Sequence, residues 1–336
     1  MKLPELAQLE RVIAAAGAEL DVRVECTVAH EGEDMPVYVL ALGNRAPGAP
    51  AVGFFGGVHG LERIGARVVI AFLHSVVARL PWDVAQRALL QQVRLVFMPL
   101  VNPGGMARNT RANPAGVDLM RNAPVEVAGR VPFLVGGQRI SAHLPWYRGR
   151  AGAGMEPESR ALCAAVEREL HGRPFSLALD CHSGFGMRDR IWFPYAHCRT
   201  PMPQLAELHA LYEIFVQSHA YHAYEFEPQS RQYLAHGDLW DHLHQRAPAE
   251  RGEVFLPLTL EMGSWLWVKK NPRQLLRRDG IFNPLIEHRE HRVLRRHVPL
   301  LDFMLRAAAG SHHWLPAGAQ RDAHHRMACV RWYGRP

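Results

Sequence analysis

Two residues near the end of an apolar run could bind a metal ion. His59 and Glu62 stand three residues apart, where the run AVGFFGG passes into a segment with helical spacing. A neutral imidazole and a carboxylate at this spacing can converge on one ion, and zinc accepts nitrogen and oxygen ligands. The chain holds 20 histidines, so the pair is weak evidence by itself, and a catalytic zinc site needs a third protein ligand.

Candidates for a third ligand and for a general base end two other apolar runs. His182 directly follows FSLALDC, and Asp180 could accept a hydrogen bond from its imidazole. A histidine that only ends a strand is the other interpretation. Glu261 ends the run VFLPLTLE, where a carboxylate could take a proton from an attacking water or could form a structural ion pair.

Two arginines lie between the metal-ligand candidates, in the segment VNPGGMARNTRANPAGVDLMRNAP. Arg111 and Arg121 are ten residues apart there. One could polarise a scissile carbonyl, and the other could hold a carboxylate by a bidentate pair. Each arginine alone would be an ordinary surface charge.

The elements that must position these residues alternate between strands and helices. Apolar runs predict strands over 22–28, 36–42, 51–55, 93–99, 175–181, 190–195 and 254–261, the first two paired around the polar turn HEGED. Helical spacing favours a helix near the N-terminus and helices over 62–79, 156–171, 202–219, 237–245 and 289–309. The alternation predicts an α/β fold with three α/β/α layers around a mixed, mostly parallel sheet. Ligands of such sheets bind at the carboxyl ends of the strands, where these candidates lie.

The same pattern predicts the domain organisation. We expect a single catalytic domain over residues 1–310, with the N-terminal helix and hairpin included, and an irregular tail over 311–336. Residues 102 to about 154 are rich in Gly, Pro, Asn and Arg. An irregular stretch of this length is unusual in a compact domain unless it builds a site.

Composition excludes several classes of function. The formal charge is +7, but the arginines are dispersed and do not interleave with aromatic residues, so we expect no nucleic-acid partner. The densest basic cluster, Arg289 to Arg296 in HREHRVLRR, predicts a solvated helix face. Five scattered cysteines indicate free thiols rather than a disulfide framework. No run reaches the roughly 20 apolar residues of a membrane helix, and the N-terminus lacks the features of a signal peptide, so we expect a cytoplasmic protein with no membrane partner.

The order of the motifs resembles the zinc metallocarboxypeptidase family, the M14 peptidases. The resemblance runs from about residue 51 to residue 263 and includes HxxE, NPxG, GVDLMRN, a strand that ends in His-Ser, a Tyr-x-x-x-Gly and a Thr-x-Glu. Each motif is short, but six in the same order with comparable gaps are specific. The resemblance implies the carboxypeptidase fold and one zinc ion per chain.

The resemblance also implies roles for individual residues. It makes His59, Glu62 and His182 the zinc ligands and Glu261 the general base. Arg111 would stabilise the oxyanion, Arg121 would bind the terminal carboxylate, Tyr233 would close over the substrate, and Trp240 would lie near the specificity pocket. One position departs from the family, whose motif usually reads Asp-Leu-Asn-Arg-Asn. Met120 replaces that asparagine, which puts tight recognition of an ordinary C-terminal carboxylate in doubt.

The resemblance implies a hydrolase that cleaves a C-terminal peptide or amide bond of a substrate that carries a carboxylate. Two related enzyme activities stay open: an N-acyl amino-acid deacylase of the succinylglutamate desuccinylase or aspartoacylase kind, and an amidase that acts on cell-wall tripeptide. A peptidase fold that has lost activity and only binds its ligand is the non-enzymatic alternative. The sequence identifies neither the substrate nor the oligomeric state.

Overall fold

The computed structural model describes residues 3–248 and 252–334, and a central sheet of eight strands organises them. The strand order is β1-β2-β4-β3-β5-β8-β6-β7. Parallel pairs β4/β3, β3/β5 and β5/β8 form the middle, and β1/β2, β2/β4 and β8/β6 are antiparallel. The strands are β1 (Asp21–His30), β2 (Glu33–Gly43), β3 (Ala51–Gly56), β4 (Arg94–Met98), β5 (Phe175–Ser183), β6 (Arg190–Phe193), β7 (Glu225–Pro228) and β8 (Val254–Met262).

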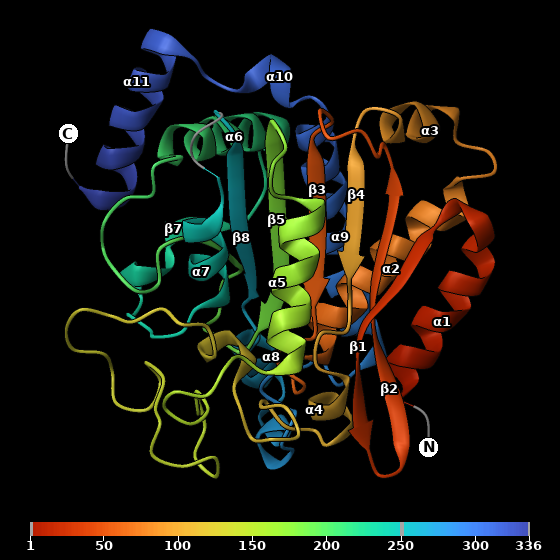
Figure 1. Cartoon of the computed structure of the whole chain (residues 1–336), viewed down its shortest axis with the longest axis vertical. Helices are drawn as coiled ribbons and strands as arrows, with labels where there is room; N and C mark the ends of the chain where they lie inside the picture. Colours follow the sequence, from red (N-terminus) through yellow and green to blue (C-terminus); the bar gives the residue numbers. More distant parts are fainter. Residues whose placement is uncertain (1–2, 249–251, 335–336) are drawn as a thin grey trace.

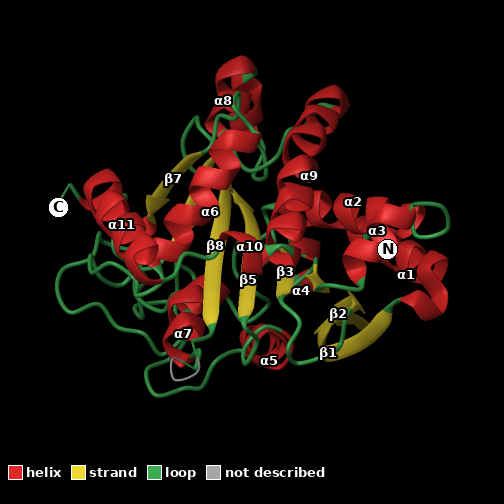
Figure 2. Cartoon of the chain, turned by 90° about the horizontal axis from the view of Figure 1, so that it is seen from above, coloured by secondary structure: helices red, strands yellow, loops and turns green. Residues whose placement is uncertain are grey.

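Helices cover both faces of this sheet. Figure 2 shows α2, α6 and α9 on one side of the sheet and α5 and α7 on the other. The longer helices are α1 (Pro4–Ala16), α2 (Arg63–Arg79), α5 (Pro157–Glu169), α6 (Leu205–Ser218), α7 (Leu239–Arg246), α9 (Glu287–Ala309) and α11 (Gly318–Ala328). Short helices are α3 (Val84–Leu90), α4 (Pro103–Ala107), α8 (Trp265–Lys270) and α10 (Ser311–Trp314). The expected three-layer α/β/α architecture with a mixed sheet is confirmed (Figure 1).

Burial follows from this layering. Every residue of β3, β4 and β5 is buried, because helices lie against both faces of the middle strands. The edge strand β1 is largely exposed and pairs with β2 in the expected hairpin. Its turn is Glu31-Gly32, and both residues have positive φ. The strands β5 and β8 lie next to each other in the sheet and are buried almost throughout.

The prediction of an irregular C-terminal tail is wrong for the described residues up to 334. The chain forms α10, α11 and a π-helical turn, η5 (Cys329–Tyr333), after residue 310. Trp332 is buried and packs against Phe193 and against His209 and Tyr212 of α6. The helices form because they bury this surface, and tertiary packing of this kind leaves little periodicity in the local sequence.

The long segment before α5 is irregular as expected. From residue 108 to residue 156 the described chain has only a 3₁₀ turn, η2 (Leu119–Arg121), and one isolated bridge between Gln138 and Tyr147. Backbone bonds tie it to the rest of the molecule, since Gly60 N donates to Arg111 O and Ala123 N donates to Gly237 O. The segment is therefore held in place without regular structure.

No single helix in the described chain has the length and apolar character to cross a membrane. The helices α2 and α3 reach that length and apolar character only when they are taken together, and they are bent by 114° relative to each other.

Candidate metal and catalytic site

The site begins with the alternation of side chains along β5 and β8. Leu177, Leu179 and Cys181 of β5 point into the core beneath α2 and α9. Because successive side chains of a strand point to opposite faces, Asp180 and His182 share the other face. In β8 the same alternation puts Glu261 on that face, and the parallel register makes it the direct neighbour of His182.

Glu62 reaches this face from the start of α2, which approaches the end of β5 very closely. A Cβ atom on Gly65 would lie 2.0 Å from the carbonyl oxygen of Cys181. A Cβ atom on Gly60 would lie 2.1 Å from the carbonyl carbon of Gly105. Only glycine permits these two approaches. They let Glu62, the residue that precedes α2, lie beside the end of β5.

The three expected metal ligands converge at this point. Nδ1 of His59 lies 2.9 Å from Oε1 of Glu62, and Nδ1 of His182 lies 3.0 Å from Oε2 of the same carboxylate. The two Nδ1 atoms are 3.2 Å apart. All three side chains are buried, and their donor atoms lie within 4.8 Å of one another. It is the only such group of three or more His, Cys, Asp or Glu residues within 3–248 and 252–334.

Each imidazole uses its other nitrogen for a second carboxylate. Nε2 of His59 lies 3.1 Å from Oδ1 of Asp118, and Nε2 of His182 lies 2.7 Å from Oδ2 of Asp180. A carboxylate there accepts the ring proton at Nε2, so both Nδ1 atoms present lone pairs. Two imidazole nitrogens and the Glu62 carboxylate suit zinc, and this donor set fits a catalytic site with one open position.

Asp118 is a site residue that sequence reasoning did not single out. Besides His59, its carboxylate accepts a bond of 2.8 Å from Nε of Arg111. Burial alone would raise the pKa of Asp118, but the charges of Arg111 and His59 lower it well below its usual range. The available signal was its place in GVDLMRN, three residues before Arg121.

Glu62 is held as a carboxylate in the same way. Burial favours its neutral form, but the charges and hydrogen bonds of His59 and His182 outweigh burial and lower its pKa. Backbone N–H of Ser183 also donates to its Oε2 at 2.9 Å, and Nη1 of Arg111 donates to Oε1 at 3.2 Å. A buried anion with this many donors has little freedom to rotate away from the imidazoles.

Glu261 is buried beside the ligands without touching them. Its Oε1 accepts a bond of 3.0 Å from the backbone N–H of Phe185. Burial and then the negative charge of Glu62 raise its pKa to about 8. A carboxyl group whose pKa lies near neutrality can both accept and return a proton.

Arg121 and Tyr233 meet across the same space. Nη2 of Arg121 lies 3.3 Å from the phenolic oxygen of Tyr233. Arg121 forms no ion pair within the described residues. The Arg121 side chain is buried, and its Nε has no hydrogen-bond partner there. Met120, at the position of the usual asparagine, is buried next to it. A buried guanidinium with unused donors is costly unless an anion joins it.

These residues line one cavity of about 900 Å³. Its chemistry is mixed: the metal ligands, Glu261 and both arginines stand among aromatic and aliphatic side chains. The aromatic lining residues are Trp146, Phe185, Trp192, Tyr233, Trp265 and Phe282. The cavity is large enough for a small ligand, and its polar groups converge at one end.

Trp240 takes a different place from the one that the resemblance implied. It is buried outside the cavity lining, and its ring packs edge-on against Phe55 at 5.0 Å. Its Nε1 donates to Oδ2 of Asp180 at 3.0 Å, the oxygen that also meets His182. The helix α7 carries the side chain to the back of the ligands, so Trp240 contacts the support of His182 rather than a ligand space.

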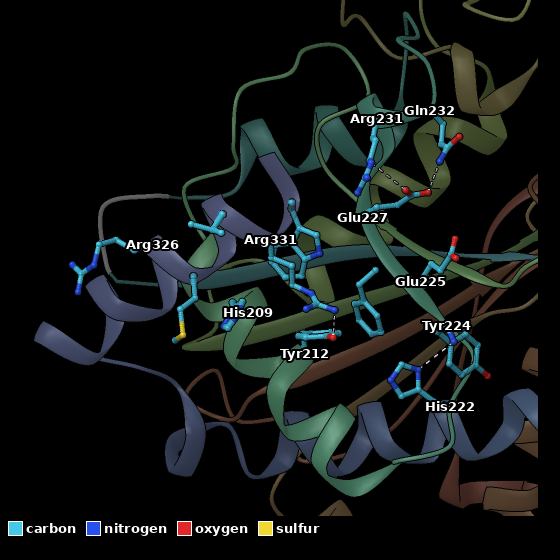
Figure 3. A pocket seen from close by; sticks show the side chains of 14 residues that line it. His209, Tyr212, His222, Tyr224, Glu225, Glu227, Arg231, Gln232, Arg326 and Arg331 are labelled. Atoms are coloured by element: carbon cyan, nitrogen blue, oxygen red, sulfur yellow. Dashed lines mark hydrogen bonds and ion pairs between the residues drawn. The ribbon is translucent and has the colours of Figure 1, made fainter. Parts of the chain in front are cut away.

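A second hollow lies away from the metal ligands. It has about 1160 Å³ and lies between α6, β7 and the C-terminal helical segment (Figure 3). Arg331 stacks over the ring of Tyr212 at 4.2 Å and bonds its hydroxyl, and Glu227 bonds Gln232. Arg231 lies 4.0 Å from Glu227 in this hollow, and none of the expected site residues lines it.

Comparison with known proteins agrees with this geometry. The family model described as zinc carboxypeptidase matches residues 16–262. Carboxypeptidase SOL1 of Arabidopsis thaliana is 30% identical over 93 residues, which are 26% of this chain and 19% of that protein. The chain thus matches about a fifth of the length of this curated relative.

Solved structures share the fold over most of the chain. Bovine thrombin-activatable fibrinolysis inhibitor, in complex with tick carboxypeptidase inhibitor, has a TM-score of 0.62 at 20% identity and covers 91% of this chain and 94% of its own. Carboxypeptidase A from Helicoverpa armigera has a TM-score of 0.65 at 18% identity, and the match covers 91% of this chain and 72% of that structure's chain. A metallo-carboxypeptidase from Burkholderia cenocepacia has a TM-score of 0.51 at 17% identity, and the match covers 88% of this chain and 68% of that structure's chain.

Proposed function

Since this chain belongs to the zinc carboxypeptidase family, we propose that it is a zinc-dependent hydrolase that releases the C-terminal residue of a peptide. The observation that carries the proposal is the place of Arg121. It is a buried cation with unused donors, and it lines the same cavity as His59, Glu62 and His182. A substrate carboxylate at Arg121 would supply the missing anion and bring the last amide bond toward the metal ligands.

His59, Glu62 and His182 would hold one zinc ion per chain. Zinc in such a site lowers the pKa of water and polarises a carbonyl. Asp118 and Asp180 keep the ring protons at Nε2, so that both Nδ1 atoms stay free as ligands.

The other side chains have separate tasks in the proposed reaction. Glu261 takes the proton of the attacking water and returns it to the leaving amine. Arg111, fixed by Asp118, faces the cavity and stabilises negative charge on the carbonyl oxygen. Tyr233 positions the substrate beside Arg121. The burial of Glu261 supports its part, because burial brings its pKa into the range that proton transfer needs.

The decisive experiment compares peptides that differ only at the C-terminus. Zinc-loaded protein is expected to release the last residue from a free acid and to leave the matching C-terminal amide intact, because Arg121 needs an anion. Arg121→Ala should raise KM for the free acid at least about tenfold, in line with the loss of a charged hydrogen bond. The control variant is Arg199→Ala, because Arg199 is exposed and forms no ion pair in the described part of the chain.

N-acyl amino acids form the second arm of the same assay. Met120 lines the cavity with an apolar side chain, at the position where the family's asparagine would contact the substrate carboxylate. This change is the reason for a test of small substrates with an apolar acyl group. Cleavage of N-acyl amino acids with no cleavage of peptides would contradict the carboxypeptidase proposal and favour the deacylase. Binding without hydrolysis of any substrate at full zinc occupancy would favour a binding protein.

A further inference from the structure

The positive charge of the chain is concentrated beside the catalytic cavity. Residues 264–296 contain nine lysines and arginines but only three acidic residues, whereas the whole chain has a formal charge of +7. This segment forms α8, the 3₁₀ turn η4 (Pro272–Leu276) and the first half of α9. The basic residues, expected to be dispersed, are thus enriched in this one segment, and the fold places it beside the catalytic cavity.

Part of this segment lines a hollow of about 620 Å³ that we call the basic groove. Its walls are α8, α9 and the loop before β6, and its cations include Lys270, Arg289, Arg292 and Arg296. The three arginines are spaced three and four residues apart, which puts them on one side of α9. The basic side of α9, which the sequence predicts to be solvated, thus lines a hollow on the protein surface.

Several cations of the basic groove have no acidic partner. Arg296 pairs with Asp189 at 2.8 Å, and Arg188 pairs with Glu225. Within the described part of the chain, Lys270, Arg289 and Arg292 form no ion pair. The acidic groups that line the groove are already bound, so a net positive charge remains for a ligand.

One short helix separates the basic groove from the catalytic cavity. Trp265, Val268 and Lys269 of α8 line the cavity, whereas Trp267 and Lys270 line the groove. Met187 lines both hollows. A helix is about 10 Å wide, and an extended peptide advances about 3.3 Å per residue, so about three or four residues would cross α8.

We propose that the basic groove binds an acidic segment of the substrate peptide, about four or more residues before the C-terminus. This rests on the proposed carboxypeptidase function, because the peptide must have its last residue at Arg121. Its upstream residues would then pass Lys269 and meet Lys270 and Arg292. A nucleic acid fits less well, because the aromatic rings that line the groove, Trp267 and Tyr224, are buried and offer no face for stacking.

The test uses the full-length, zinc-loaded protein and two peptides with the same last three residues. One peptide carries four glutamates upstream of these residues, and the other carries four glutamines. We expect kcat/KM to be about five- to tenfold higher for the acidic peptide at low salt, with the difference in KM rather than kcat. The preference should fall as salt is raised, since the groove is open to solvent.

Two double variants locate the effect. Lys270→Gln/Arg292→Gln is expected to bring the acidic-to-neutral ratio of kcat/KM close to one. The control Arg11→Gln/Arg199→Gln removes the same charge from exposed positions of α1 and of the loop after β6, and it should keep the wild-type ratio.

The outcomes separate this inference from the proposed function. If neither peptide is cleaved, the carboxypeptidase proposal fails, and the inference fails with it. If both are cleaved equally well, or if the control variant loses the preference as fully as the groove variant, the basic groove is not a substrate site although the enzyme is a carboxypeptidase. Single-stranded DNA that binds wild type but not the groove variant, with no peptide preference, would also overturn the inference.

Discussion

At the scale of single residues, the site depends on which ring nitrogen carries a proton. His59 and His182 both turn Nδ1 toward Glu62 and Nε2 toward an aspartate. The aspartates are buried acceptors, so they hold the ring protons at Nε2 even when no metal is bound. The affinity for zinc should therefore depend on Asp118 and Asp180 as well as on the ligands themselves.

Asp180→Asn tests this dependence. The amide cannot hold the ring proton of His182 as a carboxylate does, so we expect zinc affinity to fall about 10- to 100-fold while the fold is kept. Competition with a chromophoric chelator measures the affinity. Asp322→Asn, at an exposed position of α11, is the matched control. Equal zinc affinity in Asp180→Asn and wild type would show that the carboxylate does not act through His182.

Glu261→Gln separates metal binding from proton transfer. The amide keeps the shape and cannot accept the proton, so activity should fall at least about 100-fold with one zinc per chain retained. Elemental analysis and peptide hydrolysis measure the two properties on the same sample. Near-normal turnover in the zinc-loaded variant would remove Glu261 from the reaction.

At the scale of elements, the site joins the start of α2 to the ends of β5 and β8. Gly65 makes this possible, because a side chain there would clash with the backbone of Cys181. The helix α7 supports the site from behind through Trp240. Its N-cap, Asp238, accepts bonds of 2.9 Å from the backbone N–H groups of Trp240 and Asp241.

Asp238 predicts a pH dependence of stability. Burial and then the charge of Asp241 raise its pKa to about 7, above the ordinary value of about 3.9 in an unfolded chain. The folded protein therefore binds this proton more tightly than the unfolded chain, and this contribution to stability is complete below about pH 4 and is lost as pH rises to about 7.

Asp238→Asn removes this titration and keeps an acceptor for the helix cap. We expect the variant to be more stable than wild type at pH 8, by on the order of 4 kcal/mol, because the shift is about three pKa units and each unit is worth about 1.4 kcal/mol. The difference should vanish near pH 4. Urea unfolding at both pH values measures it, with Asp322→Asn as the control. A constant difference at all pH values would mean that the cap, and not the charge, is responsible.

At the scale of the whole molecule, the ligands come from segments that only the folded chain brings together. His59 and Glu62 precede α2, and His182 is the residue before the last one of β5. An unfolded chain cannot present this ligand set, so a bound metal should stabilise the native state.

Removal of zinc should lower the thermal midpoint. Metal at 100 times its Kd contributes about 2.7 kcal/mol, which corresponds to roughly 4 °C for a chain of 336 residues. Calorimetry with and without a chelator measures the shift. His182→Ala should show almost none of it, and an equal shift in that variant would mean that the metal binds elsewhere.

Much of the fold and the ligand set follows from local sequence. Apolar runs and helical spacing predict most strands and the longer helices, and the order of short motifs identifies His59, Glu62 and His182 as a group. These features are local because strand alternation, helical periodicity and motif spacing are properties of neighbouring residues. The expected strand over 175–181 in fact continues through Ser183, so His182 lies within the sheet beside Glu261.

Long-range contacts explain what local sequence did not reveal. The helical C-terminal segment, the place of Trp240 behind Asp180, and the contact of Asp118 with His59 all depend on residues that are distant in the chain. The basic groove is the same kind of feature, because arginines of α9 gain a function only beside α8 and the catalytic cavity. Residue types set the chemistry that is available, whereas packing determines which of those groups meet and which stay in solvent.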